Sequence, residues 1–334
     1  MGTAVGTKEA ARRHLAKLYE PVEGELRQVE TLLQQELESP HAAVGELTAH
    51  SLKLGGKRLR PAFVLLAGSA AGRVTHEHVV LGTVMEMIHT ATLIHDDVLD
   101  SADLRRHVQT SHALFGREAS VLLGDYLFTH AFFLCSSLES TFACRTIGRA
   151  TNIVCEGEMR QIASRGRFEI DEEEYLSIIE GKTAELCACC CQLGAHYAGA
   201  DEATCEALDR FGRYLGIAFQ IVDDLLDVEG DESVTGKSLG TDLDQQKPTL
   251  PIIRLLETLN GTRREQVLRN LQSSDAEARS TVRRLLVETE SLAYARNRAE
   301  EFASRARDIL DVLAAGPARQ SLELMAHFVV HRPT

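Results

Sequence analysis

Proline is absent from positions 62 to 247, and this long gap is the feature that most constrains the fold. Proline disrupts helix interiors. A span this long that lacks it, rich in Ala, Leu and Glu and without sustained apolar/polar alternation, therefore predicts long helices rather than strands. Short polar or glycine-containing stretches separate its apolar segments, as is typical of antiparallel neighbours in a bundle. Those segments are 62–71, 79–99, 119–138, 176–199 and 207–228. The sequence predicts an all-α fold, a single large antiparallel helix bundle that forms one domain over residues 1–334.

The charge balance argues against nucleic acid as a partner. Lys and Arg together number 36 and Asp and Glu 49, which gives a formal charge of −13, whereas binding to a phosphate backbone needs a basic face. The first residues lack the apolar core of a secretion signal, and no apolar run approaches the roughly 18 to 20 residues of a membrane span. We expect a cytoplasmic protein.

Two copies of the pattern Asp-Asp-x-x-Asp stand 127 residues apart (223 − 96). They are Asp96, Asp97 and Asp100, and Asp223, Asp224 and Asp227. On a helix, the first and last Asp of each copy project from one face, and such crowded carboxylates make sense when a divalent cation shares them. Hard oxygen ligands suit Mg²⁺, which combines one or two carboxylates with substrate phosphates. A single copy is more simply explained as a solvated acidic face, but both copies follow apolar stretches, where unpaired charge is costly.

Basic residues beside glycines and polar breaks are suited to hold the phosphates that such metals bridge. In the segment 55–61, Lys57 and Arg60 are three residues apart at a predicted helix start, where the helix dipole also favours an anion. Arg105 and Arg106 follow the first acidic motif, Lys182 follows Gly181, and Lys237 and Lys247 follow the second motif. Each alone is compatible with a solvated side chain, but the whole set indicates an anion site.

Two other patterns are assigned no catalytic or metal-binding role. The segment 230–238 almost matches a nucleotide-binding P-loop, but five rather than four residues separate its glycines, and no strong strand precedes it. Cys187, Cys189, Cys190 and Cys191 lie in a predicted helix without a second motif at zinc spacing, so small apolar packing is the favoured role.

Together these residues resemble the trans-type isoprenyl diphosphate synthases, the polyprenyl synthetase family, from about Glu46 to Arg332. The resemblance depends on an ordered series of motifs: 55–61, His89 to Asp100, Arg105-Arg106, Gly124-Asp125-Tyr126, Gly157-Glu158 with Gln161, Gly181-Lys182-Thr183, Phe219-Gln220 to Asp227, and Gly236-Lys237 through 240–251. It implies an all-helical homodimer in which the two acidic motifs face each other across a central cavity. His107 and Gln246 stand where the family usually has glycine, which affects loop geometry but removes no charged ligand.

The resemblance also implies a role for each matching residue. Asp96, Asp97, Asp100, Asp223 and Asp224, with Asp227 nearby, would hold three Mg²⁺, or Mn²⁺, that bridge to the diphosphate of the allylic substrate. Arg105, Lys182, Lys237 and Lys247 would contact that diphosphate, while Lys57, Arg60, His89 and Arg106 would hold isopentenyl diphosphate. Thr183 and Gln220 would lie beside the developing carbocation. The reaction would be ionisation of the allylic diphosphate, attack by the double bond of isopentenyl diphosphate, and loss of a proton.

Side chains below the first acidic motif are expected to set product length. Ala91 and Thr92 lie one turn before Asp96 and are small, and one turn rises about 5.4 Å, comparable to one isoprene unit. The tunnel should therefore run past the point where a farnesyl synthase stops. Met87 lies another turn down, and Phe132 or Phe133 from a later helix would form a deeper floor. The expected product is a long-chain all-trans polyprenyl diphosphate of about thirty to fifty carbons, with at most peripheral membrane contact for its release.

Three alternatives stay open. The first is the same enzyme class with a shorter product, geranylgeranyl diphosphate. A terpene cyclase also uses one aspartate-rich motif, but its second metal motif normally carries Asn or Asp, Ser or Thr, and Glu. A non-catalytic subunit of a heteromeric synthase characteristically loses the acidic motifs, and both are complete here.

Overall fold

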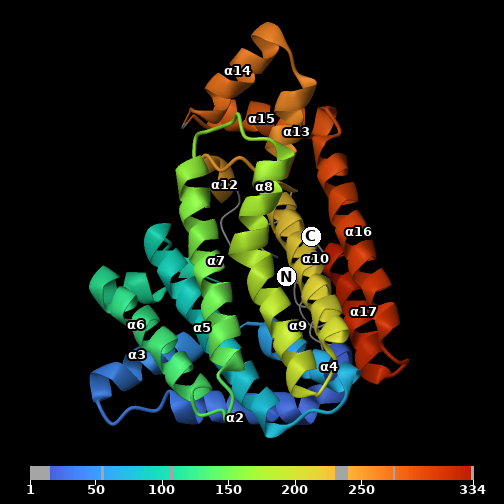
Figure 1. Cartoon of the computed structure of the whole chain (residues 1–334). Coiled ribbons are helices and arrows are strands. Elements are labelled where there is room, and N and C mark those ends of the chain that lie inside the picture. The colour runs from blue at the N-terminus through green and yellow to red at the C-terminus, as the bar shows by residue number, and fades with distance from the viewer. Residues whose placement is uncertain (1–15, 54–55, 106–107, 230–239, 274, 332–334) are drawn as a thin grey trace, which may run out of the picture. The chain divides into compact units, whose positions relative to one another are not determined.

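The computed structural model describes residues 16–53, 56–105, 108–229, 240–273 and 275–331 (Figure 1). The described chain is almost entirely helical. Its strands form one hairpin of two residues each, β1 (Leu104–Arg105) paired antiparallel with β2 (Val108–Gln109). The predicted all-α class is confirmed, and none of the described helices is both long and apolar enough to cross a bilayer.

The longer helices contain the apolar segments identified in the sequence. They are α2 (Glu23–Glu36), α3 (Ala42–Lys53), α4 (Leu59–Ala71), α5 (His76–Leu99), α6 (Ser111–Cys135), α7 (Phe142–Ser164), α8 (Glu172–Ile179), α9 (Glu185–Tyr197), α10 (Glu202–Glu229), α13 (Leu250–Thr258), α14 (Gly261–Leu271), α15 (Ala276–Glu288), α16 (Ser291–Ile309) and α17 (Pro317–Val330). Shorter elements are η1 (Glu20–Val22), η2 (Glu180–Ala184), α12 (Thr241–Asp244) and η3 (Leu310–Val312).

The chain forms two compact units. The first comprises Met1–Arg149, Cys189–Asp209 and Leu310–Leu324, and the second comprises Ala150–Ala188, Arg210–Ile309 and Met325–Thr334. Four of their boundaries fall within α7, α9, α10 and α17 rather than in linkers. The predicted single domain stays a prediction, and each unit is described by itself below.

Helix α5 is the centre of the first unit, where it packs against α2, α4 and α6. It begins after Thr75, whose backbone N–H donates to His78 Nδ1 at 3.0 Å, while His78 Nε2 donates to the backbone oxygen of Gly194 in α9 at 2.9 Å. Gly68 of α4 gives this imidazole room, because a Cβ there would lie 2.3 Å from His78 Nε2. These contacts fix the start of the helix that carries the first acidic motif at its other end.

The second unit contains a local break in helical geometry. Between α8 and α9 the chain forms a π-helix, η2, over Glu180–Ala184. Single π turns inside helices are rare and are frequent at functional sites. Gly157 of α7 and Gly216 of α10 let the backbones of these helices approach this segment closely. A Cβ at Gly157 would lie 2.4 Å from the backbone nitrogen of Lys182, and one at Gly216 would lie 2.5 Å from Ala184 Cα. In the same unit α13 packs against α15 and α16, and α14 against α15, among the orange and red helices of Figure 1.

Candidate active site

The first acidic motif ends helix α5. Asp97 is buried, and its Oδ1 accepts from Arg105 Nε at 2.8 Å and lies 2.7 Å from Arg105 Nη2. Its other carboxylate oxygen, Oδ2, is buried without a hydrogen-bond partner in the described part of the chain. Asp96 and Asp100 are half-buried. The guanidinium gives Oδ1 of Asp97 a charge-assisted partner and leaves Oδ2 for a further ligand.

The Gly124-Asp125 motif on α6 contacts the same helix, α5. His95, next to Asp96, has its Nε2 3.2 Å from the backbone oxygen of Val121 and 3.5 Å from a carboxylate oxygen of Asp125. A Cβ at Gly124 would lie 2.2 Å from His95 Nε2, so any larger residue would displace the ring. The motif therefore sets the contact between α5 and α6 beside the carboxylates.

The predicted ligands of the second substrate lie in the first unit as well. Lys57 is exposed just before α4, while Arg60 in its first turn and His89 on α5 are half-buried. The buried Nε of Arg60 has no hydrogen-bond partner among the described residues. Arg106 and Lys237, which were predicted to bind diphosphate, lie outside the described residues.

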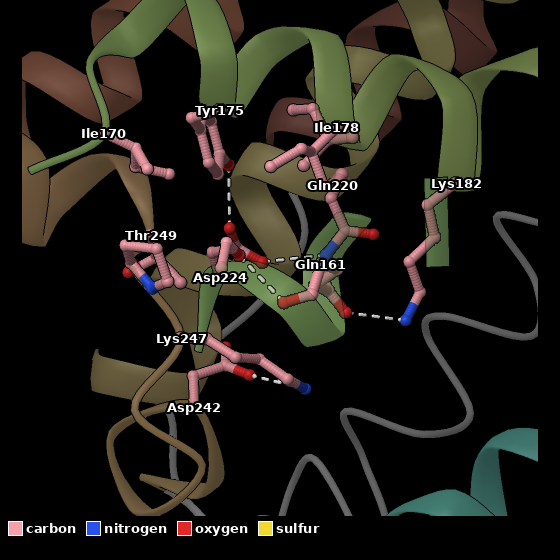
Figure 2. Close-up of a pocket in the computed structure, with 13 residues that line it drawn as sticks. Gln161, Ile170, Tyr175, Ile178, Lys182, Gln220, Asp224, Asp242, Lys247 and Thr249 are labelled. Atoms are coloured by element: carbon pink, nitrogen blue, oxygen red, sulfur yellow. Dashed lines mark hydrogen bonds and ion pairs between the residues drawn. The ribbon is translucent and has the colours of Figure 1, made fainter. Parts of the chain in front are cut away.

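The second acidic motif lies on α10 in the second unit, and its Asp224 has a different environment. The Asp224 carboxylate is 5% exposed and accepts hydrogen bonds from Tyr175 Oη and Gln220 Nε2, both at 2.7 Å (Figure 2). Burial, reinforced by the negative charge of Asp242, raises the pKa of Asp224 to about 8. Asp223, one residue earlier, is half-buried.

A hydroxyl and an amide extend this network. Thr183 Oγ1 in η2 donates to Gln220 Oε1 at 2.8 Å, and Gln220 Nε2 donates in turn to Asp224 Oδ1. The hydroxyl proton of Thr183 is thereby committed, which leaves its oxygen lone pairs as acceptors. This is the arrangement expected of groups that stabilise a cation without donating a proton to it.

Two lysines reach the same cavity. Lys182 Nζ donates to Gln161 Oε1 at 2.8 Å and pairs with Glu158, while Lys247 Nζ lies 3.3 Å from Asp242 Oδ1. Figure 2 shows both lysines with Asp224 and Gln220 along one cavity of the second unit. The carboxylates that pair with the lysines hold them in place beside the cavity.

Asp227 differs from the other acids of its motif. Its carboxylate accepts from Thr241 N at 3.2 Å, from Thr241 Oγ1 at 2.9 Å and from Asp242 N at 3.0 Å. The side chain thus binds the N-terminus of α12, after Gly240 in a left-handed conformation with φ 77°. Asp227 therefore has a structural task, and its predicted metal contact stays a prediction.

The residues present fit a divalent metal. The unpartnered, buried Oδ2 of Asp97 is suited to accept a cation. No three His, Cys, Asp or Glu side chains in the described chain converge on one point that could hold a metal by themselves. A single available carboxylate oxygen is compatible with Mg²⁺, which typically combines one or two carboxylates with water and substrate phosphates.

The predicted chain-length residues separate into buried and exposed groups. Ala91 and Met87 on α5 are fully buried, and Thr92 donates its hydroxyl to the backbone oxygen of His89 at 2.8 Å. On α6, Phe132 is half-buried but Phe133 is 71% exposed. An exposed ring cannot close a tunnel within one chain, so of the two phenylalanines Phe132 is the better candidate for the floor.

Three residues of the site received no role from sequence reasoning. Tyr175 and Asp242 act on Asp224, and Gln161 holds Lys182. Gln161 and Asp242 stood within the motifs that carried the resemblance, so a signal was present, but nothing in the spacing connects Tyr175 to an aspartate 49 residues away. The four-cysteine stretch is buried in α9, in keeping with the packing role expected for it.

The chain is similar to known proteins in both sequence and fold. Residues 41–289 match the polyprenyl synthetase family. The chain is 37% identical to the octaprenyl diphosphate synthase of Haemophilus influenzae over 319 residues, which cover 95% of this chain and 96% of that protein. Among solved structures, a decaprenyl diphosphate synthase from Rhodobacter capsulatus aligns with a TM-score of 0.89 at 34% identity, covering 95% of this chain and 99% of that one. A polyprenyl synthase from Caulobacter crescentus complexed with calcium and isoprenyl diphosphate aligns with a TM-score of 0.89 at 35% identity, covering 95% and 98%.

An all-helical fold with two aspartate-rich helices and neighbouring lysines and arginines defines an enzyme of the prenyltransferase class. The matches extend over nearly the whole chain and include proteins well above 30% identity. The chain belongs to the polyprenyl synthetase family.

Proposed function

We propose that this protein condenses isopentenyl diphosphate with an allylic diphosphate to make a long-chain all-trans polyprenyl diphosphate of about thirty to fifty carbons. The observation that carries the proposal is the connected set Thr183–Gln220–Asp224 beside Lys182. It combines a fixed cation, a buried carboxylate and acceptor oxygens, which are the groups that an ionising diphosphate ester needs. The names of the relatives, octaprenyl and decaprenyl diphosphate synthases, support the long-chain product.

The cations of the site would bind the allylic diphosphate. We assign this task to Arg105, Lys182, Lys237 and Lys247. Lys182 and Lys247 already pair with acidic side chains, so they are pre-positioned and need only exchange partners when the diphosphate arrives.

The metal would be Mg²⁺, three ions held by Asp96, Asp97, Asp100, Asp223, Asp224 and Asp227. When bound, the ions supply positive charge that stabilises the departing pyrophosphate. The protein contributes oxygen ligands in two environments, with Asp97 supported by Arg105 and Asp224 oriented by Tyr175 and Gln220.

The remaining steps depend on the second substrate and on the exclusion of water. Lys57, Arg60, His89 and Arg106 would hold isopentenyl diphosphate, so that its double bond attacks the allylic carbon. The oxygen of Thr183 and the dipole of Gln220 stabilise positive charge near that carbon, and the proton lost afterwards goes to the pyrophosphate. Water must be excluded because it would capture the cation.

A homodimer is the second part of the proposal, and the surface of α6 supports it. Val121, Leu122 and Phe133 are 38%, 67% and 71% exposed, and all three follow the kink at Gly116, where φ is 83°. Exposed apolar side chains gathered on one helix mark an interaction site, and a second copy of the same helix offers the matching apolar face. Light scattering should give twice the mass of one chain, and Leu122→Glu with Phe133→Glu should give a monomer. An unchanged dimer in that double variant would contradict this interface.

One assay tests the reaction. Purified protein is incubated with Mg²⁺, labelled isopentenyl diphosphate and farnesyl diphosphate, and the products are sized after phosphatase treatment. A ladder that ends at thirty or more carbons supports the proposal, whereas a stop at twenty carbons supports a geranylgeranyl diphosphate synthase. No elongation at all would favour a non-catalytic subunit. The Asp96→Ala, Asp97→Ala double variant is the control and should make no product.

A further inference from the structure

Arg58 lies between two predicted ligands of isopentenyl diphosphate and has an unusual backbone conformation. Its φ is 53° and its ψ is 38°, in the left-handed region, at the residue immediately before α4. Residues with a Cβ rarely adopt this backbone conformation, whereas glycine would adopt it without strain. An arginine persists here only if its side chain makes contacts that outweigh the strain.

Those contacts are two glutamates from two other helices. Arg58 Nε and Nη2 bind the two carboxylate oxygens of Glu30 on α2, and Nη1 donates to Glu86 Oε1 on α5 at 2.6 Å. The Arg58 side chain is 14% exposed and that of Glu86 only 3%. Burial alone would lower the pKa of Arg58, but the two glutamates outweigh it and raise that pKa. Arg58 is therefore fully engaged inside the protein and does not present its charge to a ligand.

The backbone on either side is fixed as well. Tyr19 Oη donates to the backbone oxygen of Lys57 at 2.6 Å, and Ala62 N donates to the backbone oxygen of Arg58 at 3.1 Å, which begins the helix. Gly82 of α5 allows a close approach, since a Cβ there would lie 3.5 Å from Pro61 and 3.1 Å from a methyl carbon of Val29. The short segment that carries Lys57 and Arg60 is thus held from three directions.

Glu86 is the group that makes Arg58 necessary. Its Oε2 is buried and has no hydrogen-bond partner among the described residues, and neither does the buried Nε of Arg60. Burial is the main cause of the raised pKa of Tyr19. The charge of Glu86 raises this pKa further and that of Arg60 lowers it, so both side chains lie near the same ring. Without Arg58, a buried carboxylate would be left without its cation, and Arg60 is the neighbouring guanidinium able to replace it.

We propose that Arg58 is a positioning residue for the isopentenyl diphosphate site. It neutralises Glu86 and holds the left-handed turn, so that Arg60 is available to the diphosphate together with Lys57. This inference rests on the proposed function, because it assigns a support to a site of that function. It predicts that loss of Arg58 harms one substrate far more than the other.

The test is steady-state kinetics in which each substrate is varied separately with Mg²⁺ at saturation. For Arg58→Ala we expect the KM for isopentenyl diphosphate to rise about tenfold, while the KM for farnesyl diphosphate and kcat change by less than about twofold. A second substitution, Glu86→Gln, should restore the KM to within about threefold of wild type, because a neutral amide no longer competes for Arg60. If Arg58 had only a structural role, the second substitution would not restore the KM for isopentenyl diphosphate.

Three further variants keep the result decisive. Arg58→Gly retains an unstrained left-handed turn but lacks the pairs, and it should resemble Arg58→Ala. Arg58→Lys, which keeps a charge, should fall between wild type and Arg58→Ala and serves if Arg58→Ala fails to fold. Arg27→Ala removes an exposed pair with Glu23 on α2, the helix that also carries Glu30, and should behave as wild type.

Calorimetric binding of isopentenyl diphosphate without an allylic substrate separates the two proposals. A wild-type protein that binds this substrate but does not elongate would contradict the proposed function, and weaker binding by Arg58→Ala would still support the inference. An unchanged KM and unchanged binding in a folded Arg58→Ala would overturn the inference, as would a wild-type KM in Arg58→Gly or equal damage to both substrates.

Discussion

The two aspartate motifs have the same pattern but opposite electrostatic surroundings. In the first, Asp97 is buried and forms an ion pair with the Arg105 guanidinium. In the second, Asp224 is equally buried but its partners are a phenol and an amide, and the pKa of its carboxyl group rises to about 8. A motif defined by spacing alone therefore conceals two different kinds of carboxylate.

The difference suggests a division of labour between the motifs. A carboxylate paired with arginine is oriented before any substrate arrives. A carboxylate held by neutral donors becomes charged at the cost of burial, and a bound cation compensates that cost.

The largest effect is expected when either carboxylate is neutralised. We expect Asp97→Asn and Asp224→Asn each to lower kcat by about 10²- to 10³-fold, since each loses a carboxylate that would hold the cations beside the leaving group. Single-turnover rates at saturating Mg²⁺ check this. A variant with wild-type turnover would remove its motif from the reaction.

The same two variants should differ in stability. The folded-state pKa of Asp224, about 8, lies above its ordinary value of 3.8, so the folded protein binds the extra proton and the contribution of this group is lost as pH rises between these values. In chelator we expect Asp224→Asn to melt above wild type at pH 8.5, with the gap closing as pH falls toward 4. Asp97→Asn leaves Arg105 without its anion and should melt below wild type. Equal shifts of the same sign in the two variants would contradict the contrast.

The residues one turn before each motif also differ. One turn before the first motif stand Ala91 and Thr92, and at the matching positions before the second motif stand Ala218 and Phe219. Only the first helix therefore carries small side chains at both positions, which leaves room for a growing tail. We expect Ala91→Phe to shorten the longest product by at least one isoprene unit while the rate of the first condensation changes little. Ala293→Phe, at an exposed position of α16, is the control. An unchanged ladder in Ala91→Phe would contradict the tunnel at this position.

A smaller effect should follow removal of the phenol that orients Asp224. Tyr175→Phe leaves Asp224 Oδ2 without its donor while the ring still fills its buried site. We expect the Mg²⁺ concentration for half-maximal rate to rise about tenfold, with an unchanged product ladder. Tyr126→Phe, on the half-exposed ring of α6, should leave both unchanged.

The smallest effect lies away from both motifs. Burial lowers the pKa of His78, whose Nδ1 accepts from Thr75 N and whose Nε2 donates to Gly194, so this histidine is neutral in the folded protein. A lowered folded-state pKa means that its stabilisation is complete above the ordinary value of 6.5 and is lost as pH falls below it. The melting temperature of wild type should fall from pH 7 to pH 5 by a few degrees more than that of His78→Gln. Parallel curves would contradict this assignment.

Much of the fold could be predicted because helix formation depends on local pattern. The apolar segments fell in α4, α5, α6, α8 to α9 and α10. The π turn at Glu180–Ala184 could not be predicted from the residues of the segment alone, because close packing by Gly157 and Gly216 accompanies it. Likewise Phe133 resembles Phe132 in sequence, and only helix packing decides which ring is exposed.

The site likewise has features that follow from the sequence and features that depend on the tertiary structure. The sequence by itself determined which chemical groups the chain carries and that each acidic set shares one helix, since spacing along a helix is a local property. The tertiary structure decided what each group can do: Arg105 pairs with Asp97, Tyr175 orients Asp224, Asp227 caps α12, and Glu30 and Glu86 hold Arg58. Charge state and orientation depend on burial and on partners from distant segments, and neither exists until the chain has folded.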